Sequence, residues 1–533
     1  MPPLVPRPLR SRTTPGSSPA AGAWSISPTA RSLEPVARTA HDLIAPHCPG
    51  LSPHIDTGSP GTDGSRRIRL ALAQPDELPP LPAPTGVDPS GPQGESERYR
   101  LTVDADAITC TARGPRGLLR AAATAAQLLG AGGGLEHQVI DDVPHYAWRG
   151  LMLDPARSFI ALDDLRRLVD LAALHRLNVL HLHLTDNEAW RIEIPGRPRL
   201  TETAEGGYYS VEDFQGLQRY AADRYVTIVP EVDLPGHCAA ATRAYPDLGV
   251  LTPPASVPPQ VAAVLPRPLD PSDARSAAFI DEVYGALAAL THGPFVHIGG
   301  DEVFGISAEP FTAAVHRARA AVRAAGRRAI GWQETARAGS GPEDVSQFWV
   351  DSAMADLPVT RDQYDARPEF AEAGLTPELV RRLAAHFAPA DQDVARALAG
   401  GGSVLLSPQS HLYLDRPYHS HDLPEAERER LRSLGFAHYR PQSVREAAAW
   451  QPLAHAVPEA RIAGIEATLF GETLRAFEDL SRMLLPRLAG VAEIAWSGAP
   501  DSWPAYSRRL GAQARLWRQR DLRFVPAAGI DWA

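Results

Sequence analysis

Residues 148–186 read WRGLMLDPARSFIALDDLRRLVDLAALHRLNVLHLHLTD, and this stretch decides the fold. Two short apolar runs, WRGLML at its start and NVLHLHL near its end, have the length of buried strands. Between them, residues 163–175 place apolar side chains at the spacing of one buried helical stripe: Leu165, Leu168, Val169, Ala172 and Ala173. Buried strands that alternate with helices predict a parallel sheet.

The same rhythm continues toward the C-terminus. Eight strand-like runs occur, at 148–154, 178–186, 225–233, 295–302, 328–334, 346–350, 403–408 and 462–472. Most of them end in a polar or acidic residue. Eight such runs predict a (β/α)8 TIM barrel, an α/β fold whose chemistry lies at the carboxyl ends of the strands. The long segment at about 351–402, with a helix beginning near Thr376, is predicted to be an insert.

The region before the barrel has a different organisation. Residues 1–24 are rich in Pro, Ser and Arg, and we predict a flexible N-terminal leader there. In residues 25–143, the strand-like runs RRIRLALA, YRLTV and AITCTA precede an apolar helical segment at 117–129. This order predicts a small α+β domain. Because the domain holds no cluster of catalytic residue types, we predict that it is non-catalytic and that residues 144–533 form the catalytic barrel.

Composition excludes several classes of protein. The chain has 533 residues, 44% hydrophobic and 22% charged, with a formal net charge of −10. This charge argues against a nucleic-acid partner, because a phosphate-binding surface needs an excess of Lys and Arg. Neither a secretory signal nor a run of membrane-spanning length is evident, so a cytoplasmic location without membrane attachment is expected. Three widely spaced cysteines predict neither a disulfide framework nor a zinc site.

Carboxylates and aromatic residues are concentrated at the strand ends. The acids are Asp154, Asp186, Asp233, Asp301, Glu302, Glu334, Asp415 and Glu472, and the tryptophans in or near these segments are Trp148, Trp190, Trp332, Trp349 and Trp450. Aromatic faces stack on the apolar faces of sugars, and carboxylates accept hydrogen bonds from sugar hydroxyls. Any one of these residues alone is also consistent with a purely structural role. Together at a barrel mouth they favour a carbohydrate substrate.

Asp301 and Glu302 are adjacent, directly after the run VHIGG. Burial and like-charge repulsion would raise the pKa of one of them, giving a proton donor near neutral pH. Successive residues of an extended chain point in opposite directions. The two are therefore unsuited to be the carboxyl pair of an ordinary retaining glycosidase, which flanks one bond at roughly 5–5.5 Å. Either an acid from another strand or the substrate itself supplies the nucleophile.

His181 and His183 lie two apart on one predicted strand, so they point to the same face. A metal-dependent hydrolase would use such a pair, with His237 and His297 as further ligands. A histidine pair alone is a weak metal motif. We favour the alternative that these rings bond barrel acids or substrate, and we predict no metal and no cofactor.

Several motifs together resemble glycoside hydrolase family 20, the β-N-acetylhexosaminidases. They are HIGGDE (297–302), WRGLMLDPAR (148–157), LHLTDNEAWRIEI (182–194), PEVDLPGH (230–237), WQE (332–334), FW (348–349), YLD (413–415) and EATLFGE (466–472), in the family's order. The resemblance covers about residue 105 to the C-terminus. It implies an exo-acting, retaining hydrolase in which the substrate's 2-acetamido oxygen is the nucleophile and an oxazolinium ion is the intermediate.

The resemblance also implies residue roles. Glu302 is the general acid and then the base, Asp301 orients the acetamido N–H, and Tyr413 bonds the acetamido carbonyl. Trp332 and Trp349 enclose the acetamido methyl. Further substrate-binding or supporting roles fall on Arg157, Asp186, His237, Asp415, Trp450, Phe470 and Glu472, with Trp450 stacking on the neighbouring sugar and His297 as an additional supporting candidate.

Two departures from the family pattern concern specificity. Phe470 stands where the family commonly has Trp, and Asn187, Glu188 and Ala189 replace the usual Asp–Gln–Gly. A related exo-enzyme that releases a disaccharide, or a barrel that only binds sugar, are therefore the alternatives. The expected partner is an N-acetylhexosamine-terminated glycan or chitooligosaccharide. The sequence fixes neither the oligomeric state nor a preference between glucosamine and galactosamine.

Overall fold

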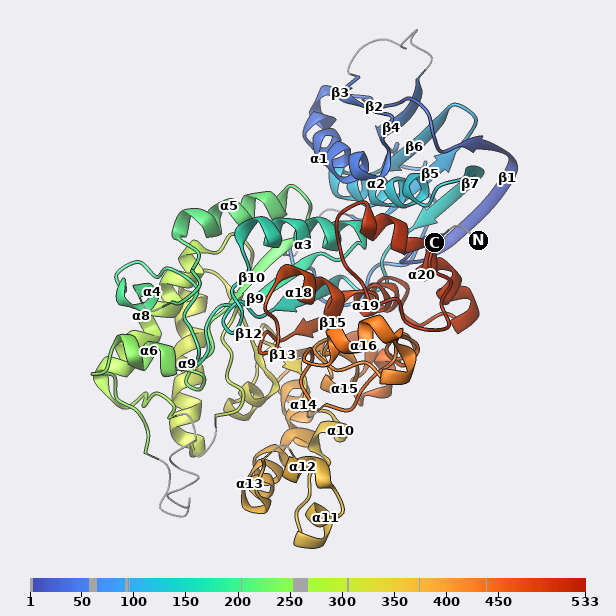
Figure 1. The fold of residues 1–533 in the computed structure, drawn as a ribbon. Coiled ribbons are helices and arrows are strands. Elements are labelled where there is room, and N and C mark those ends of the chain that lie inside the picture. Colours follow the sequence, from blue (N-terminus) through green and yellow to red (C-terminus); the bar gives the residue numbers. More distant parts are fainter. Residues whose placement is uncertain are drawn as a thin grey trace.

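The computed structural model describes residues 3–533 apart from 57–64, 92–93, 95, 203, 253–266, 304–305, 373 and 438. Eight parallel strands, neighbours in chain order, close into a barrel (Figure 1). They are β8 (Trp148–Leu153), β9 (Val179–His183), β10 (Thr227–Glu231), β11 (Phe295–His297), β12 (Arg328–Trp332), β13 (Val345–Phe348), β14 (Ser403–Leu406) and β15 (Ile462–Leu469). Seven of the eight predicted runs contain one of these strands and the run 346–350 overlaps β13, so the predicted TIM barrel is confirmed.

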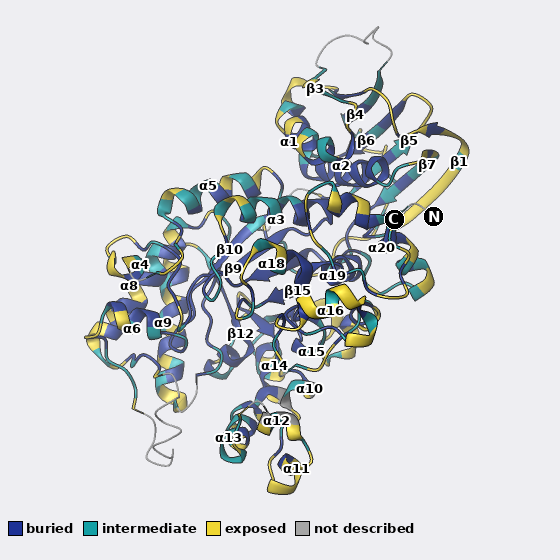
Figure 2. Cartoon of the chain, in the orientation of Figure 1, coloured by how far each residue is buried: buried dark blue, intermediate teal, exposed yellow. Residues whose placement is uncertain are grey.

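The first crossover shows why the chain folds this way. Helix α3 (Leu162–Leu174) connects β8 to β9 and buries Leu165, Leu168 and Val169 against the core. All residues of β8 and β9 are buried, as expected for strands covered by helices outside and filled by side chains inside (Figure 2).

Side chains fill the barrel interior in layers. An apolar layer contains Trp148, Val179, Val229, Phe295, Ile330, Val345, Leu405 and Ala463. Buried polar side chains come next toward the carboxyl ends of the strands, among them His181, Glu231, Gln347 and Glu466. A layer of buried polar and charged side chains therefore lies directly beneath the barrel mouth. Such a layer is unusual, because charged residues are seldom fully buried unless they are paired.

A seven-stranded mixed sheet precedes the barrel, with strand order β1-β7-β5-β6-β4-β2-β3. Its members are β1 (Arg10–Pro19), β2 (Trp24–Pro28), β3 (Leu51–Ile55), β4 (Arg66–Leu72), β5 (Tyr99–Val103), β6 (Ala107–Ala112) and β7 (Gly134–Asp142). Helices α1 (Glu34–Ile44) and α2 (Pro115–Gly130) pack together on it, and α2 also contacts α3 of the barrel. The predicted α+β domain before the barrel is confirmed.

The prediction of a flexible leader at residues 1–24 is wrong for the part that the structure describes. Strand β1 lies within it and pairs antiparallel with β7, from Arg10 opposite Asp141 to Pro19 opposite Gly134. Leu4 and Val5 are fully buried, and the Val5 N–H donates to Gln127 Oε1 at 2.9 Å. The prediction failed because an exposed edge strand rich in Ser and Arg lacks the apolar alternation of a half-buried strand.

A buried ionic cluster joins the two domains. Glu97, just before β5, lies 2.7 Å from both Arg120 of α2 and Arg149 of β8, and 3.4 Å from Arg116. Arg120 also donates to the Tyr225 carbonyl of the barrel at 2.9 Å. Burial raises the pKa of Glu97, but the three guanidinium groups outweigh it and hold that pKa well below its usual range.

Removing this carboxylate should be costly. We expect Glu97→Ala to lower the free energy of unfolding by about 3–5 kcal/mol, because it leaves buried arginines without their counter-ion. Urea unfolding followed by circular dichroism measures the loss. Glu136→Ala, an exposed position on β7, is the control and should change stability by no more than about 0.5 kcal/mol. Equal losses for the two variants would contradict the assigned role of Glu97.

The segment between β13 and β14 contains several helices: α10 (Ser352–Ala355), α11 (Arg361–Asp365), α12 (Pro368–Glu372), α13 (Pro377–Phe387) and α14 (Ala390–Ala399). Of these, α11, α12 and α13 project from the barrel, whereas α14 packs against β13 and β14 (Figure 1). Helix α13 begins as predicted, with the Thr376 hydroxyl accepting from the Leu379 N–H. Among the described residues, no helix combines the length and apolar character needed to cross a membrane.

Candidate active site

The barrel mouth gathers the predicted carboxylates around one arginine. Arg157, three residues after Asp154, lies 3.1 Å from that carboxylate and 2.6 Å from Asp186 beyond β9. Its Nε is also 3.6 Å from Glu472, which follows β15. Its guanidinium stacks over the Phe470 ring at 5.4 Å. Residues more than 300 positions apart in the sequence are thus brought to one point because all of them follow barrel strands.

The loop after β11 carries the two adjacent acids in an unusual backbone conformation. Gly299 has φ +63° and packs so closely on Asp233 that a Cβ there would lie 1.9 Å from Asp233 Oδ1. The next amide, Gly300 N–H, donates to the same oxygen at 2.7 Å. Glu302 has φ +47°, a strained value for a residue with a side chain. The two glycines let the chain turn sharply, so that the acids face different parts of the mouth.

Glu302 lies at the open side of the mouth beside a histidine. Its side chain is 34% exposed, and its Oε2 is 3.7 Å from His237 Nε2. His237 Nδ1 in turn lies 3.0 Å from Asp186 Oδ1. Desolvation raises the pKa of Glu302, with His237 and Arg157 opposing it. Burial disfavours charge on His237, but Asp186 raises the pKa of this ring to about 9. The arrangement holds a carboxyl that can be protonated near neutral pH against a histidine that can be cationic.

Asp301 faces the other side of the loop and is half-buried. It lies beside Asp233, with which His237 completes a group of oxygen and nitrogen atoms within 4.8 Å of one another. Burial first, and then the interaction between the two carboxyls, raise the pKa of Asp301 well above its usual range, whereas burial raises that of Asp233 to about 7. Two neighbouring buried carboxyls cannot both ionise freely, so the pair retains one proton to near neutral pH.

Aromatic rings line the space next to Asp301. Trp332 and Trp349 meet at 6.4 Å and 72°, and Trp349 stacks on Tyr413 at 6.3 Å and 13°. Phe470 contacts Tyr413 at 5.3 Å. The Trp349 indole N–H donates to Glu334 Oε2 at 3.1 Å, and that of Trp332 donates to Glu231 Oε1 at 2.8 Å. Both indole walls are thus fixed by buried carboxylates.

Buried polar atoms without a hydrogen-bond partner among the described residues are found at this mouth. They include Asp233 Oδ2, Asp301 Oδ1, Glu334 Oε1 and Asp415 Oδ1. Buried polar groups in folded proteins are nearly always hydrogen-bonded. Acceptor atoms left open beside aromatic walls are what a ligand with several N–H and O–H donors and an apolar face requires.

The structure brings together all the predicted site residues except one. Trp450 is the exception: it follows α17 (Val444–Ala448), which packs on the outer helix α19 (Arg487–Ser497). Its indole N–H donates to His455 at 3.0 Å, and the side chain is buried in the main core. The stacking of Trp450 on a sugar therefore stays a prediction.

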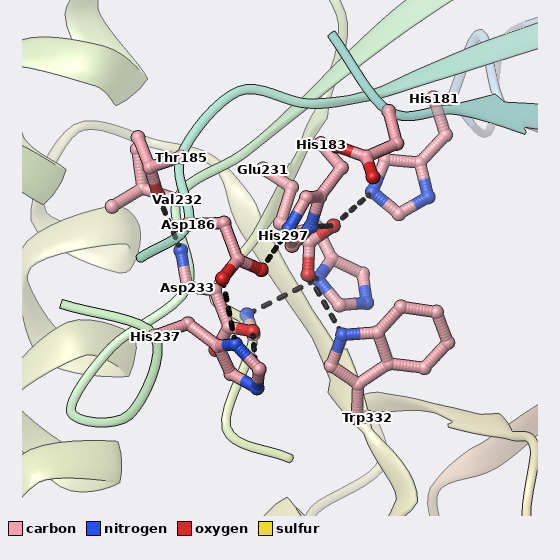
Figure 3. A network of polar contacts seen from close by, with 12 residues as sticks. His181, His183, Thr185, Asp186, Glu231, Val232, Asp233, His237, His297 and Trp332 are labelled. Atoms are coloured by element: carbon pink, nitrogen blue, oxygen red, sulfur yellow. Dashed lines mark hydrogen bonds and ion pairs between the residues drawn. The ribbon is translucent and has the colours of Figure 1, made fainter. Parts of the chain in front are cut away.

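Two residues of the site were not singled out from the sequence. Glu231 ends β10 and lies fully buried at the centre of a ring of nitrogen atoms (Figure 3). The sequence signal that could have identified it is the charge of Glu231 within the apolar strand run, in PEVD. Tyr439 lies on the loop after Asp415, and its ring meets Tyr413 at 6.1 Å. Its place in a long polar loop gave no sequence signal.

The histidine pair has found acidic partners, as favoured from the sequence. His181 lies 2.8 Å from Glu466 and 3.1 Å from Glu231, and His183 lies 2.7 Å from Glu231 and 2.9 Å from Asp186. By distance alone, three groups could hold a metal ion: His181–Glu231–His297, His183–Glu231–Asp233 and Asp233–His237–Asp301. The first two are already held together by nitrogen–carboxylate contacts within the protein.

The raised pKa values predict how stability depends on pH. Burial raises the pKa of Asp415 to about 7 and that of Glu334 to about 8, so the folded protein retains protons that the unfolded chain loses near pH 4. His181, whose neighbouring carboxylates overcome burial to raise its pKa to about 9, gives stability that is lost above its unfolded value of roughly 6.5. Both effects have the same sign between pH 6.5 and 9, where stability should fall as pH rises.

Thermal unfolding at pH 7.5, 8.0 and 8.5 measures this effect, and we expect the midpoint to fall by a few degrees. Below this range the buried histidines with lowered pKa, among them His47, His175 and His386 at about 4, act in the opposite direction, because the unfolded chain still binds protons near its histidine pKa of roughly 6.5. Glu334→Gln removes one titrating carboxyl and should make the decline shallower. A midpoint that rises with pH would refute the assignment.

Comparison with known proteins gives a consistent match over the whole chain. "Glycosyl hydrolase family 20, catalytic domain" matches residues 146–365 and 386–499, and "Glycosyl hydrolase family 20, domain 2" matches residues 1–143. A beta-N-acetylhexosaminidase from Cellulomonas fimi is 34% identical over 456 residues, which span 83% of this chain and 82% of that protein.

Solved structures agree with these matches. A GH20 beta-N-acetylhexosaminidase from Streptomyces coelicolor A3(2) has a TM-score of 0.77 and 29% identity, covering 100% of this chain and 99% of its own. An N-acetyl-beta-hexosaminidase from Streptomyces plicatus, in complex with thio-NAglucal, has a TM-score of 0.75 and 29% identity, covering 100% of this chain and 98% of its own.

Proposed function

Because this chain belongs to glycoside hydrolase family 20 and is a hydrolase of β-N-acetylhexosaminides, we propose that it releases terminal N-acetylhexosamine by substrate-assisted catalysis. The proposal extends to an exo-acting enzyme that retains anomeric configuration and passes through an oxazolinium intermediate. Its substrate is a non-reducing terminal β-linked N-acetylglucosamine or N-acetylgalactosamine.

One observation carries this proposal: the two adjacent acids are divided between different surroundings. Glu302 lies beside His237 with its side chain 34% exposed, whereas Asp301 lies beside the fully buried Asp233 and has one oxygen, Oδ1, that is buried. The pair is therefore unsuited to flank one glycosidic bond as acid and nucleophile. A nucleophile carried by the substrate fits a pocket that has indole walls and an unpartnered carboxylate oxygen on Asp301.

In the first step, the acetamido oxygen attacks the anomeric carbon while the glycosidic C–O bond breaks. Glu302 gives its proton to the departing oxygen, so the leaving group departs as a neutral alcohol. With the shared proton of the pair on Asp233, Asp301 is an anion that accepts from the acetamido N–H and stabilises the positive charge that develops on the ring that forms. The Tyr413 hydroxyl donates to the acetamido carbonyl oxygen. Trp332 and Trp349 enclose the methyl group and hold the oxygen in attack geometry.

In the second step, Glu302 acts as a base. Its carboxylate takes a proton from water, whose oxygen attacks the anomeric carbon as the oxazolinium C–O bond breaks. The acetamido group is restored and the configuration is retained, because the two displacements invert the carbon twice. His237, held by Asp186, supports both protonation states of Glu302 by lying 3.7 Å from it.

The rest of the terminal sugar is assigned to the charged rim. Arg157, Asp415 and Glu472 are placed to bond its hydroxyls, and Asp415 Oδ1 is buried without a partner among the described residues. Phe470 would contact the sugar in place of the larger Trp, which leaves more room at this wall. That room is the feature favouring the alternative of a disaccharide-releasing enzyme.

A panel of chromogenic substrates tests the proposal. We expect cleavage of aryl β-N-acetylglucosaminide or β-N-acetylgalactosaminide, and negligible cleavage of the plain β-glucoside, which lacks the nucleophile. Equal cleavage of the plain glucoside would refute the role of the acetamido group. Release of a disaccharide in preference to a single sugar would favour the alternative enzyme, and binding without turnover would favour a sugar-binding barrel. Loss of activity on chelation with EDTA would instead support a metal-dependent hydrolase.

A further inference from the structure

Glu231 connects two parts of the site, represented by His183 and Trp332, that lie far apart in the sequence (Figure 3). Each of its carboxylate oxygens meets two ring nitrogens. Oε1 lies 2.8 Å from the Trp332 Nε1 and 2.9 Å from His297 Nδ1. Oε2 lies 2.7 Å from His183 Nδ1 and 3.1 Å from His181 Nε2. Among the described residues, Glu231 is the carboxylate that contacts both the Trp332 indole and these histidines.

The first connection is to the aromatic pocket. Trp332 is 1% exposed and forms one wall of the proposed acetamido site. An indole has a single polar atom, which can only donate. The bond to Glu231 therefore fixes the rotation of this ring about its side-chain axes, and with it the shape of the wall.

The second connection runs to the proton donor. His183 joins Glu231 to Asp186, with contacts of 2.7 Å and 2.9 Å from its two ring nitrogens. Asp186 continues to His237 at 3.0 Å, and His237 reaches Glu302. Because both nitrogens of His183 face carboxylates, a protonated ring that donates to both satisfies the geometry best.

We propose that Glu231 is a positioning residue. One of its carboxylate oxygens anchors Trp332 and the other anchors His183, which fixes the positions of the acetamido pocket and the proton donor relative to each other. The inference rests on the proposed function, since it assigns both ends of the chain of contacts a step in that reaction. A fully buried carboxylate destabilises a protein interior unless its partners compensate the charge.

Other titratable groups also face Glu231, and the test takes them into account. His181 and His297 contact it directly, Asp233 follows on the same segment, and Tyr284 of α8 (Ala274–Leu290) lies behind the strand. Glu466 of β15 is reached through His181. None of these groups is changed by the variants below.

Three variants separate the two connections. In Glu231→Gln, the amide nitrogen cannot face Trp332, because both would be donors, so it must face His183 and leave that ring neutral. This variant keeps the hydrogen bond from Trp332 and removes the positive charge of His183 from the chain of contacts that leads through Asp186 and His237 to Glu302. Trp332→Phe does the opposite: it removes the indole N–H and leaves Glu231 charged. Glu231→Leu removes both connections, and the double variant Glu231→Gln with Trp332→Phe replaces it if it does not fold.

Two readouts distinguish the connections. For Glu231→Gln, loss of the positive charge on His183 next to Asp186 makes the surroundings of Glu302 more negative. The pKa of Glu302, and with it the alkaline limb of the pH profile of kcat/KM, should therefore rise by about half a pH unit. Substrates with poor leaving groups should lose about tenfold, and activated ones less. A thiazoline mimic of the intermediate should bind as to the unchanged protein. For Trp332→Phe, thiazoline affinity should fall about tenfold while the alkaline limb stays in place.

Glu231→Leu, or the double variant, should show both changes at once. A Glu231→Gln protein that melts at lower temperature but keeps its alkaline limb and its leaving-group dependence would show a purely structural residue and overturn the proposal. So would a Glu231→Gln protein that loses thiazoline affinity as Trp332→Phe does. Failure of the proposed function itself is recognised separately, because the unchanged protein would then not bind the thiazoline.

Discussion

Glu302→Gln should lose about 10²–10⁴-fold in kcat/KM on N-acetylhexosaminides with poor leaving groups. The amide cannot donate the proton that lets an alcohol depart, and it cannot later take a proton from water. Raising the pKa of Glu302 by desolvation serves the first of these tasks, because it keeps the carboxyl protonated nearer to neutral pH. Steady-state kinetics on a disaccharide and on an aryl glycoside with an activated leaving group measure the effect.

The expected loss depends on the leaving group. An activated aryl group departs without proton assistance, so its first step should be far less affected than that of the disaccharide. Glu188→Gln is a matched control: this carboxylate is also at the mouth, 3.6 Å from Arg157, but its side chain is 55% exposed. It should change kcat/KM by no more than a few-fold. Equal losses on both substrates for Glu302→Gln would show that the residue is not the general acid.

Asp301→Asn should damage the reaction whatever the leaving group is, by about 10²–10³-fold. The carboxylate is assigned to the charge that develops on the acetamido nitrogen, and this charge forms with every substrate. An amide supplies no negative charge and can present its own N–H to the acetamido N–H. Single-turnover rates on the activated aryl substrate measure this step directly.

This variant should lose activity without losing stability. Asp301 and Asp233 are neighbouring buried carboxyls whose interaction disfavours ionisation of both. Replacing one by a neutral amide relieves that repulsion, so the thermal midpoint at pH 7.5 should equal or exceed that of the unchanged protein. An Asp301→Asn protein with unchanged turnover on the activated substrate would contradict the role of Asp301. A collapse of its midpoint would show that the carboxyl pair stabilises the fold instead.

Much of the fold was accessible from the sequence because a barrel strand is recognisable in isolation. Each strand lies in a short apolar run, most of these runs end in a polar residue, and each predicted run contains or overlaps an observed strand. The same regularity located the acids, since a residue that follows a barrel strand lies at the mouth. What the sequence lacked was the outer context: β1 is a polar edge strand, and its partner β7 is more than a hundred residues away.

The sequence could predict the site only where a single residue type indicates a chemical role by itself. Asp301 and Glu302 could be separated by the alternation of an extended chain, although the structure does so through the backbone of Gly299, Gly300 and Glu302. The role of Glu231 depends on rings from three other strands, so no local pattern reveals it. Trp450 shows the opposite limit: its place among the site motifs in the sequence did not reveal that it follows α17 and packs in the main core.

The central claim is that the substrate supplies its own nucleophile to a pocket that is ready to hold it. Inhibition by a thiazoline analogue of the cyclic intermediate tests this claim most directly, because the analogue has the fused ring and the methyl group but no bond to cleave. Our account predicts competitive inhibition with a Ki at least about a hundredfold below the KM of the matching aryl substrate, as for mimics of transient species. Insensitivity to the thiazoline, with turnover intact, would contradict it.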